Sequence, residues 1–252
     1  MPGLDGVCAM IQDQQDREEA PASRVRPAPL LAPIRVEQLR FAYEEGQEPV
    51  LRDLNLQISP GSSVGIMGAT GAGKTTLVDL ILGLLEPQQG RILYGNLDIH
   101  ENIRQWQARI GYVPQNIYLT DDSIRANVAL GLYSHQIDDE SVWRALEAAQ
   151  LADFVRSLPK GLDTVIGERG VRISGGQRQR IGIARALYYD PEILFLDEAT
   201  AALDTATEAA VMESVRALSG KKTCIIIAHR RSTIQNCDAI YELREGRLER
   251  QR

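Results

Sequence analysis

A glycine-rich segment has the residue types and the spacing to hold a polyphosphate. It fits the pattern G-x-x-x-x-G-K-[ST], in which backbone N–H groups surround phosphate oxygens, the lysine reaches the β- and γ-phosphates, and a hydroxyl binds Mg²⁺. The segment runs Gly68-Ala69-Thr70-Gly71-Ala72-Gly73-Lys74-Thr75-Thr76. It predicts that the chain binds a nucleotide, and by itself it leaves kinases, GTPases, helicases and transport ATPases open.

Two adjacent carboxylates could serve a phosphate reaction. Asp197 and Glu198 directly follow the apolar run Ile193–Leu196, and ligands of open α/β sheets bind at the carboxyl ends of strands. In P-loop enzymes an aspartate at this place holds Mg²⁺, so Asp197 is the candidate metal residue. Glu198 could accept a proton from an attacking water. The alternative is a pair of acids that cap a helix from a loop.

A second candidate for anion binding lies further along the chain, at Ser174, Gly175, Gly176 and Gln177, directly before the helical stretch 178–189. Serine is a preferred N-cap, and glycines let a phosphate approach the backbone closely. An ordinary capped helix would have the same local sequence.

The residues around the first glycine-rich segment predict the elements that position it. The short apolar run Ser63–Met67 reads as a buried strand before the segment. After it, Leu77, Leu80, Ile81 and Leu84 have the i, i+3, i+4, i+7 spacing of a helix. The first N–H groups of that helix and its partial positive charge would point at the phosphates.

Hydrophobic patterning predicts an α/β fold for the rest of the chain. Loose alternation over 34–41 and 51–58 indicates an antiparallel sheet. Further apolar strands are expected at 110–113, 193–196 and 224–228, with a hairpin over 239–243 and 247–248, and their lack of alternation indicates a parallel sheet covered on both faces. The pattern between 122 and 189 is helical. We therefore expect a P-loop core with a mixed or parallel sheet, an antiparallel β subdomain and a helical insertion at about 122–189.

Composition limits the partners and the compartment. The 252 residues include 28 Lys and Arg against 34 Asp and Glu, a net charge of -6, which argues against nucleic acid as the main partner. Cys8, Cys224 and Cys237 show no paired metal-ligand spacing and cannot all pair, which favours reduced thiols in a cytosolic compartment. Cys224 begins an apolar run and is expected in the core.

The N-terminal region differs from the rest. Residues 1–33 are polar and then proline-rich, which predicts a tail or linker ahead of one domain over 34–252. No basic region followed by an apolar one marks a secretory signal. No apolar run approaches the length of about 18 residues that a spanning helix needs.

Six motifs in chain order resemble the nucleotide-binding domains of ABC transporters, and the resemblance covers nearly all of 34–250. They are Gly68–Thr76, Tyr112–Gln115, Ser174–Gln177, Phe195–Glu198, Ala201–Asp204 and His229. The resemblance implies the ABC ATPase fold, ATP and Mg²⁺ as ligands, and a head-to-tail dimer in which Ser174–Gln177 of one copy closes over the ATP held by the phosphate loop of another.

The resemblance also implies roles for single residues. Tyr43 would stack on adenine, since a π-face needs no base-specific hydrogen bond. Gln115 would bind Mg²⁺ or the attacking water through its amide oxygen, and Thr75 would supply the metal-binding hydroxyl. His229 would bridge the γ-phosphate and Glu198. Asp204 would contribute to the dimer interface.

Two departures from the family pattern are small. Ile173 stands where leucine is commoner, and Ala201 replaces a frequent serine.

Two further segments indicate the kind of transporter. The segment Gly167–Gly170 resembles a loop of ABC exporters, and 103–107 with 115–119 resembles flippases for lipid-linked oligosaccharides.

We therefore expect an ATPase that powers export or flipping through a transmembrane domain or subunit at the cytoplasmic face of a membrane. In such exporters the ATPase usually follows its membrane domain in one polypeptide. There are two alternatives. One is a soluble ABC ATPase that acts on a macromolecule such as DNA or the ribosome, and the other is a regulatory module without turnover.

Overall fold

The structure is a computed structural model, and it describes residues 32–44, 46–167, 173–200 and 203–251. Most of the expected tail over 1–33 lies outside the described residues. The same holds for Glu168, Arg169 and Gly170 of the exporter-like segment and for Ala201 and Ala202.

A four-stranded antiparallel sheet forms first along the chain. Its strands are β1 (Ile34–Phe41), β2 (Leu51–Ile58), β4 (Gln89–Tyr94) and β5 (Leu97–Asp98), in the order β2-β1-β4-β5. The alternating pattern predicted β1 and β2, and their antiparallel pairing is confirmed. The pattern did not predict β4, because its first half, Gln89-Gly90-Arg91, is polar and exposed.

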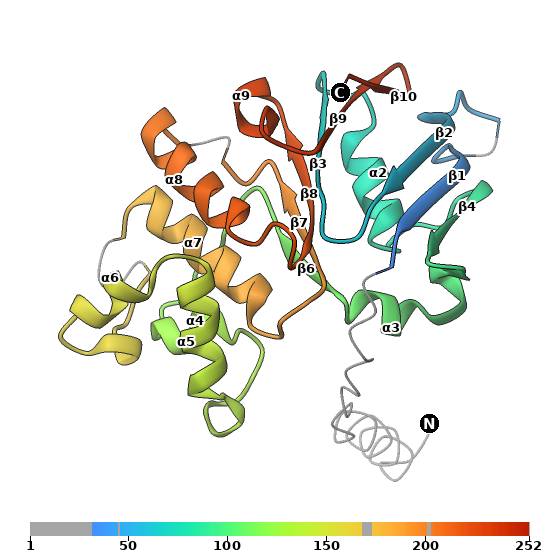
Figure 1. Cartoon of the computed structure of the whole chain (residues 1–252). Coiled ribbons are helices and arrows are strands. Elements are labelled where there is room, and N and C mark those ends of the chain that lie inside the picture. The colour runs from blue at the N-terminus through green and yellow to red at the C-terminus, as the bar shows by residue number, and fades with distance from the viewer. Residues whose placement is uncertain (1–31, 45, 168–172, 201–202, 252) are drawn as a thin grey trace, which may run out of the picture.

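A six-stranded sheet forms the centre of the molecule, in the order β10-β9-β3-β8-β7-β6 (Figure 1). Its strands are β3 (Ser63–Gly68), β6 (Ile110–Val113), β7 (Ile193–Asp197), β8 (Thr223–Ala228), β9 (Ala239–Arg244) and β10 (Arg247–Arg250). All neighbours from β9 to β6 pair in parallel, and only β10 is antiparallel. The predicted α/β core with a mixed sheet is confirmed.

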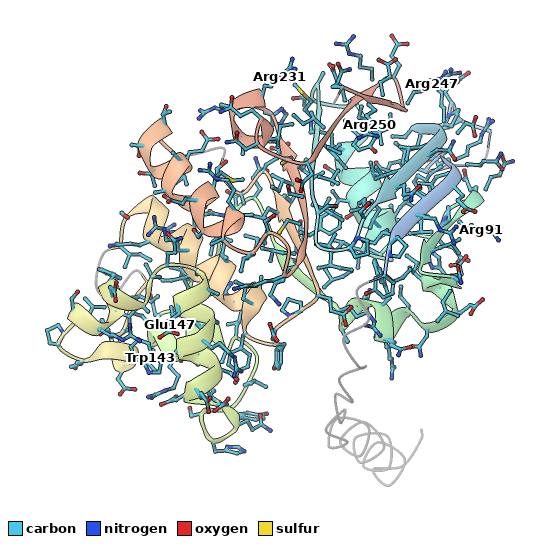
Figure 2. All side chains as sticks on the ribbon, viewed as in Figure 1. Arg91, Trp143, Glu147, Arg231, Arg247 and Arg250 are labelled. Carbon is cyan, nitrogen blue, oxygen red and sulfur yellow. The ribbon has the colours of Figure 1, made fainter. Side chains whose placement is uncertain are left out.

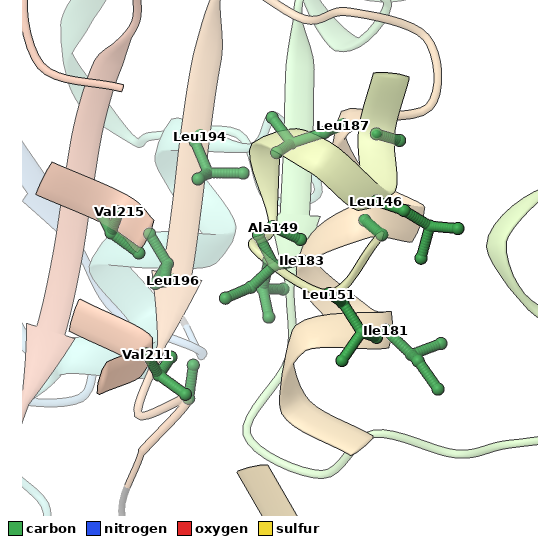
Figure 3. Close-up of a cluster of buried hydrophobic side chains, with 14 of the residues drawn as sticks. Leu146, Ala149, Leu151, Ile181, Ile183, Leu187, Leu194, Leu196, Val211 and Val215 are labelled. Carbon is green, nitrogen blue, oxygen red and sulfur yellow. The ribbon is translucent and has the colours of Figure 1, made fainter. Parts of the chain in front are cut away.

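Both faces of the central sheet are covered, as the apolar runs without alternation predicted. Phe195 of β7 packs on one face with α2 (Lys74–Ile81) and the antiparallel sheet. Its neighbours Leu194 and Leu196 pack on the other face with α7 (Gly175–Leu187) and α8 (Thr205–Arg216), as Figure 3 shows. Because successive side chains of a strand point to opposite faces, β7 joins the two cores.

Between 122 and 189 the described chain is mostly helical. It contains α4 (Ile124–Val128), α5 (Asp139–Ala148), α6 (Ala152–Ser157) and α7, with short 3₁₀ turns η2 (Ser134–Gln136) and η3 (Gly161–Asp163). Trp143 and Glu147 of α5 lie at one side of the molecule, and Arg91 of β4 lies at the other (Figure 2). This part therefore lies on the opposite side of the central sheet from the antiparallel sheet β2-β1-β4-β5.

The remaining helices are short. They are η1 (Ile99–Asn102), α3 (Ile103–Gln107) and α9 (Arg231–Ile234). Within the described ranges, every helix is too short or too polar to span a bilayer.

One sequence expectation is wrong. The apolar stripe after the phosphate loop was expected to run to Leu84, but α2 ends at Ile81 and Leu84 is exposed. Gly83 has φ +70°, and the N–H groups of Gly83 and Leu84 donate to the carbonyls of Leu80 and Asp79. These are the bonds of a Schellman motif, so a glycine at a left-handed position ends the helix one turn early.

Candidate nucleotide site

The glycine-rich loop between β3 and α2 has the backbone that its sequence predicted. Gly71 and Gly73 have φ of +80° and +100°, values that strain any other residue. A Cβ atom on Gly68 would lie 2.6 Å from the carbonyl oxygen of Leu243, so a side chain would not fit there. The loop can therefore bring its N–H groups close to an anion.

The loop leads directly into the first turn of α2. The helix begins at Lys74, and among the described residues no side chain caps it and no acid lies in its first turn. Its first N–H groups thus remain available to a ligand, and the helix dipole adds partial positive charge there. Thr75 is exposed at this end, whereas Thr76 is buried.

Lys74 folds back over the loop. Its Nζ atom donates to the carbonyls of Gly68 at 3.0 Å and Ala69 at 3.2 Å, and lies 3.7 Å from Oε1 of Glu198. Although its side chain is only 7% exposed, the ammonium is compensated by one carboxylate and two carbonyl oxygens. A buried lysine with this environment places one positive charge between the phosphate loop and the end of β7.

Parallel pairing gathers four of the predicted residues at one edge of the sheet. The strands β3, β8, β7 and β6 lie side by side in this order, and each pairs in parallel with the next. The phosphate loop follows β3, Gln115 follows β6, Glu198 follows β7 and His229 follows β8. Because all four strands end on the same side, these residues meet although they are far apart in sequence.

Glu198 lies at the centre of this group. His229 Nε2 lies 2.6 Å from its Oε1, and Gln115 Nε2 donates to its Oε2 at 3.0 Å. Because a carboxylate only accepts, Nε2 of His229 carries the proton. Glu198 has φ +48°, and its N–H donates to the carbonyl of Ile227 on β8. The strained backbone and three polar neighbours fix the direction of this carboxylate.

Asp197 has a different environment. It is half-buried and accepts a hydrogen bond from the Tyr112 hydroxyl at 3.1 Å. Burial raises the pKa of Asp197, and so does the negative charge of Glu198, whereas the Tyr112 bond and Lys74 oppose the rise. The site thus holds two adjacent carboxyl groups near a single lysine.

Sequence reasoning placed Tyr112 in a strand and gave its hydroxyl no partner. Tyr112 pairs in register with Phe195 of β7, two residues before Asp197. Burial and the nearby Asp197 raise the pKa of Tyr112. The position of Tyr112 near the carboxyl end of β6 is the signal that could have predicted its contact with Asp197, because β6 pairs with β7.

Tyr43 lies at the entrance to the phosphate loop. Its hydroxyl is 2.9 Å from Oγ1 of Thr76. The rings of Phe41 and Tyr43 pack edge to face, with an angle of 85° between the ring planes and 5.1 Å between the centroids. The Tyr43 residue is 60% exposed. An exposed aromatic ring beside a phosphate loop is suited to stacking on a base.

The second anion-binding segment lies elsewhere. Ser174 caps α7, with its Oγ accepting from the N–H of Gln177 and its own N–H donating to Gln177 Oε1. A Cβ on Gly175 would approach Leu203, and one on Gly176 would collide with Thr207. Helices α2 and α7 cover opposite faces of the sheet, and none of the hydrogen bonds of the described ranges joins Ser174–Gln177 to the phosphate loop.

The predicted metal residues suit Mg²⁺. Thr75, Gln115 and Asp197 offer a hydroxyl, an amide oxygen and a carboxylate, which are hard oxygen donors. The Gln115 amide nitrogen already donates to Glu198, so its oxygen is the atom left for a metal or water. A cation would also offset the charge of the adjacent carboxyl groups of Asp197 and Glu198.

The fold and the site together define a P-loop nucleotide-binding domain. A family model described as ABC transporter matches residues 51–201. The chain belongs to the ABC transporter family, as an ATP-binding domain of the exporter type, and members of this family hydrolyse ATP.

The names of similar proteins are consistent with this family assignment. The chain is 43% identical over 236 residues to the ATP-dependent lipid A-core flippase of Nitrosococcus oceani, covering 93% of this chain and 38% of the relative. It is 37% identical over 250 residues to the uncharacterized ABC transporter ATP-binding protein YwjA of Bacillus subtilis, covering 99% of this chain and 43% of that protein.

A solved structure of a bacterial Atm1-family ABC exporter with ATP bound has a TM-score of 0.76 and 36% identity, and it covers 97% of this chain and 43% of that chain. The chain therefore spans less than half the length of these relatives.

Proposed function

We propose that this domain hydrolyses MgATP and that the resulting cycle of dimer closure and opening drives export or flipping of a lipid through a transmembrane partner. The observation that carries the proposal is the Glu198 carboxylate, held by His229 and Gln115 beside Lys74. The family match and the likeness to the Atm1-family exporter support the general part of this proposal, an exporter-type ATP-binding domain.

Each residue of the group has a defined task in this proposal. Phosphates of ATP bind the loop 68–76, and Tyr43 stacks on the base. The γ-phosphate competes with Glu198 for Lys74, and the freed carboxylate accepts a proton from the water that attacks in line. His229 keeps Glu198 in position and contacts the γ-phosphate. Thr75, Gln115 and Asp197 would hold Mg²⁺, which would supply charge neutralisation.

The dimer follows from the position of the second anion-binding segment. The Ser174 hydroxyl accepts from within its own turn, so its hydrogen remains free to donate to a phosphate. This segment and the phosphate loop do not meet in one copy, and in the proposed dimer a second copy supplies it. A two-fold arrangement then completes two sites at once.

Exposed side chains in and next to the helical segment support a membrane partner. Tyr118, Leu130, Tyr133 and Val165 are exposed. Leu130 and Tyr133 follow α4 in the chain, and Val165 pairs with the α4 cap Ser123. Contiguous exposed apolar surface marks interaction sites. We propose that the transmembrane partner binds these side chains, which positions the domain at the cytoplasmic face.

We propose further that residues 34–252 form one domain with a helical insertion at about 122–189, and that 1–33 is a tail or linker.

The test is phosphate release from MgATP by the 252-residue chain, alone and in liposomes with its transmembrane partner, followed by lipid translocation. The proposal requires hydrolysis that stops when EDTA removes the metal and translocation that stops with it. Lipid A-type lipids and phospholipids would be compared, because several relatives are flippases for lipid A-core. No phosphate release under either condition would refute the proposal.

A further inference from the structure

A buried carboxylate outside the nucleotide site connects the two turns that carry Glu198 and His229. Among the described charged residues, only Lys74 and Glu208 are classed as buried, at 7% and 6% exposed. Lys74 belongs to the phosphate loop. Glu208 lies in the first turn of α8 and has no part in the chemistry described above, so its burial requires another explanation.

Glu208 receives hydrogen bonds from both turns. Its Oε1 accepts from Thr200 at 3.3 Å and from Thr233, and its Oε2 accepts from Arg230 at 3.1 Å. Thr200 follows Glu198 in the turn after β7, whereas Arg230 directly follows His229 in the turn after β8. One carboxylate therefore joins the two turns.

Two hollows border the region around Glu208. Glu208 and Thr233 line a hollow of about 390 Å³ between α8, α9 and the sheet. Both also line a hollow of about 250 Å³, whose other walls include Glu198 and His229. Beyond the pairing of β7 and β8, hydrogen bonds to the charged Glu208 acceptor restrain the two turns beside these hollows, and each such bond is stronger than a neutral one.

We propose that Glu208 is a positioning residue for ATP hydrolysis. It fixes the turns after β7 and β8 relative to each other, and so maintains the 2.6 Å contact between His229 Nε2 and Glu198 Oε1. It acts through Glu198 and His229 rather than on the reacting atoms. The inference rests on the proposed function, because it assigns Glu208 a part in that same reaction.

The first experiment compares Glu208→Gln with wild type and with Glu213→Gln, a matched control on the exposed side of α8. The glutamine keeps the shape but removes the negative charge, so its bonds to Arg230, Thr200 and Thr233 become weaker, neutral-acceptor bonds. Misplacing catalytic groups slightly costs up to about a hundredfold in rate, so we expect kcat to fall about tenfold or more with KM for ATP nearly unchanged. Glu213→Gln should retain wild-type kcat.

Rescue separates positioning from general destabilisation. Arg230→Lys keeps a charged donor that can reach Glu208, whereas Arg230→Gln is too short to do so, so Arg230→Lys should retain most of the kcat that Arg230→Gln loses. Thr233→Val, which removes one donor at constant shape, should lower kcat less than Glu208→Gln. If Arg230→Lys is no faster than Arg230→Gln, the contact between Glu208 and Arg230 does not position the site.

A second measurement does not depend on turnover. The chain has only three histidines, so ¹⁵N-histidine NMR resolves His229, with His100 and His135 as internal references. In Glu208→Gln the His229 Nε2 resonance should move toward its position in Glu198→Gln. An unchanged resonance together with wild-type kcat would overturn the inference, even if the variant melts at a lower temperature. Absence of hydrolysis in the wild-type chain would instead refute the proposed function, and the NMR result would still decide the role of Glu208.

Discussion

The Nε2 atom of His229 lies 2.6 Å from the Oε1 atom of Glu198, although the two residues follow different strands. The parallel pairing of β7 and β8 brings the turns after them together. The second oxygen of Glu198 accepts from Gln115 at 3.0 Å. Both carboxylate oxygens are thus held before any nucleotide binds, which is the preorganisation that a general base requires.

Replacing Glu198 by Gln should stop hydrolysis and keep ATP binding. Glutamine has the same shape but cannot accept the proton, and loss of a general base costs about 10²- to 10⁴-fold in rate. Phosphate release should fall by that factor, while the Kd for ATP, measured by calorimetry, stays within a few-fold of wild type. Wild-type turnover in this variant would remove Glu198 from its proposed role, and the exposed Glu213→Gln serves as the control.

Lys74→Ala should weaken ATP binding. A hydrogen bond to a charged group contributes about 1.5–3 kcal/mol, so the Kd for ATP should rise about tenfold or more. The polar partners of Lys74 are two loop carbonyls and Glu198, so the fold should survive, as near-native circular dichroism would show. Undiminished affinity would contradict the assignment, and the exposed Lys221→Ala provides a control for loss of one positive charge.

Much of this arrangement could be predicted from the sequence because local signals coincide with it. The glycine pattern of 68–76, the apolar strands and the carboxylates after Leu196 each have a local cause. Two features of the fold have no such local signal in the sequence. The strand β4 begins with polar, exposed residues, and the end of α2 depends on the backbone of Gly83 rather than on the apolar stripe.

Contacts between segments that are far apart in the chain could not be predicted from a single sequence. The hydroxyl of Tyr112 reaches Asp197 only because β6 and β7 pair in one particular register. The partners of Glu208 come from turns after two different strands. Periodicity reports which face of an element is buried, but it carries no information about register, so these contacts needed the structure.

Two alanine substitutions in the phosphate loop should differ in effect. Both Gly71 and Gly73 have positive φ, which costs about 1–2 kcal/mol for any residue with a Cβ. At Gly71 the new Cβ would meet no atom within 4 Å, whereas at Gly73 it would lie 3.0 Å from Leu51 and 3.1 Å from Val50. Gly73→Ala should therefore lose more unfolding free energy and more ATP affinity than Gly71→Ala. Denaturant titration tests this order, and equal losses would contradict it.

Cys224 should make stability depend on pH in the alkaline range. Burial is the main cause that raises the pKa of its thiol from 9.0 to about 12. The unfolded chain therefore ionises first, so this contribution to stability is complete below pH 9.0 and is lost as the pH rises toward about 12.

In that window one such group changes the free energy of unfolding by up to about 1.4 kcal/mol per pH unit. Denaturant titrations at several pH values should therefore show a shallower alkaline decline for Cys224→Ala than for wild type. Parallel declines would show that the thiol stays un-ionised in both states or ionises equally in both. The neighbouring Cys237, with its pKa raised to about 11, contributes in the same direction.

In the proposed dimer, Lys74 of one copy and Ser174 of another hold the same ATP. This is tested with two chains that both carry Glu198→Gln, one with Lys74→Ala and the other with Ser174→Arg. Neither chain alone should form an ATP-bound dimer, because every site of such a dimer lacks one half. Mixed, they should form a dimer that holds one ATP, against two for Glu198→Gln alone. A mixture that forms no ATP-bound dimer, or a Glu198→Gln chain that stays monomeric when saturated with ATP, would contradict this arrangement.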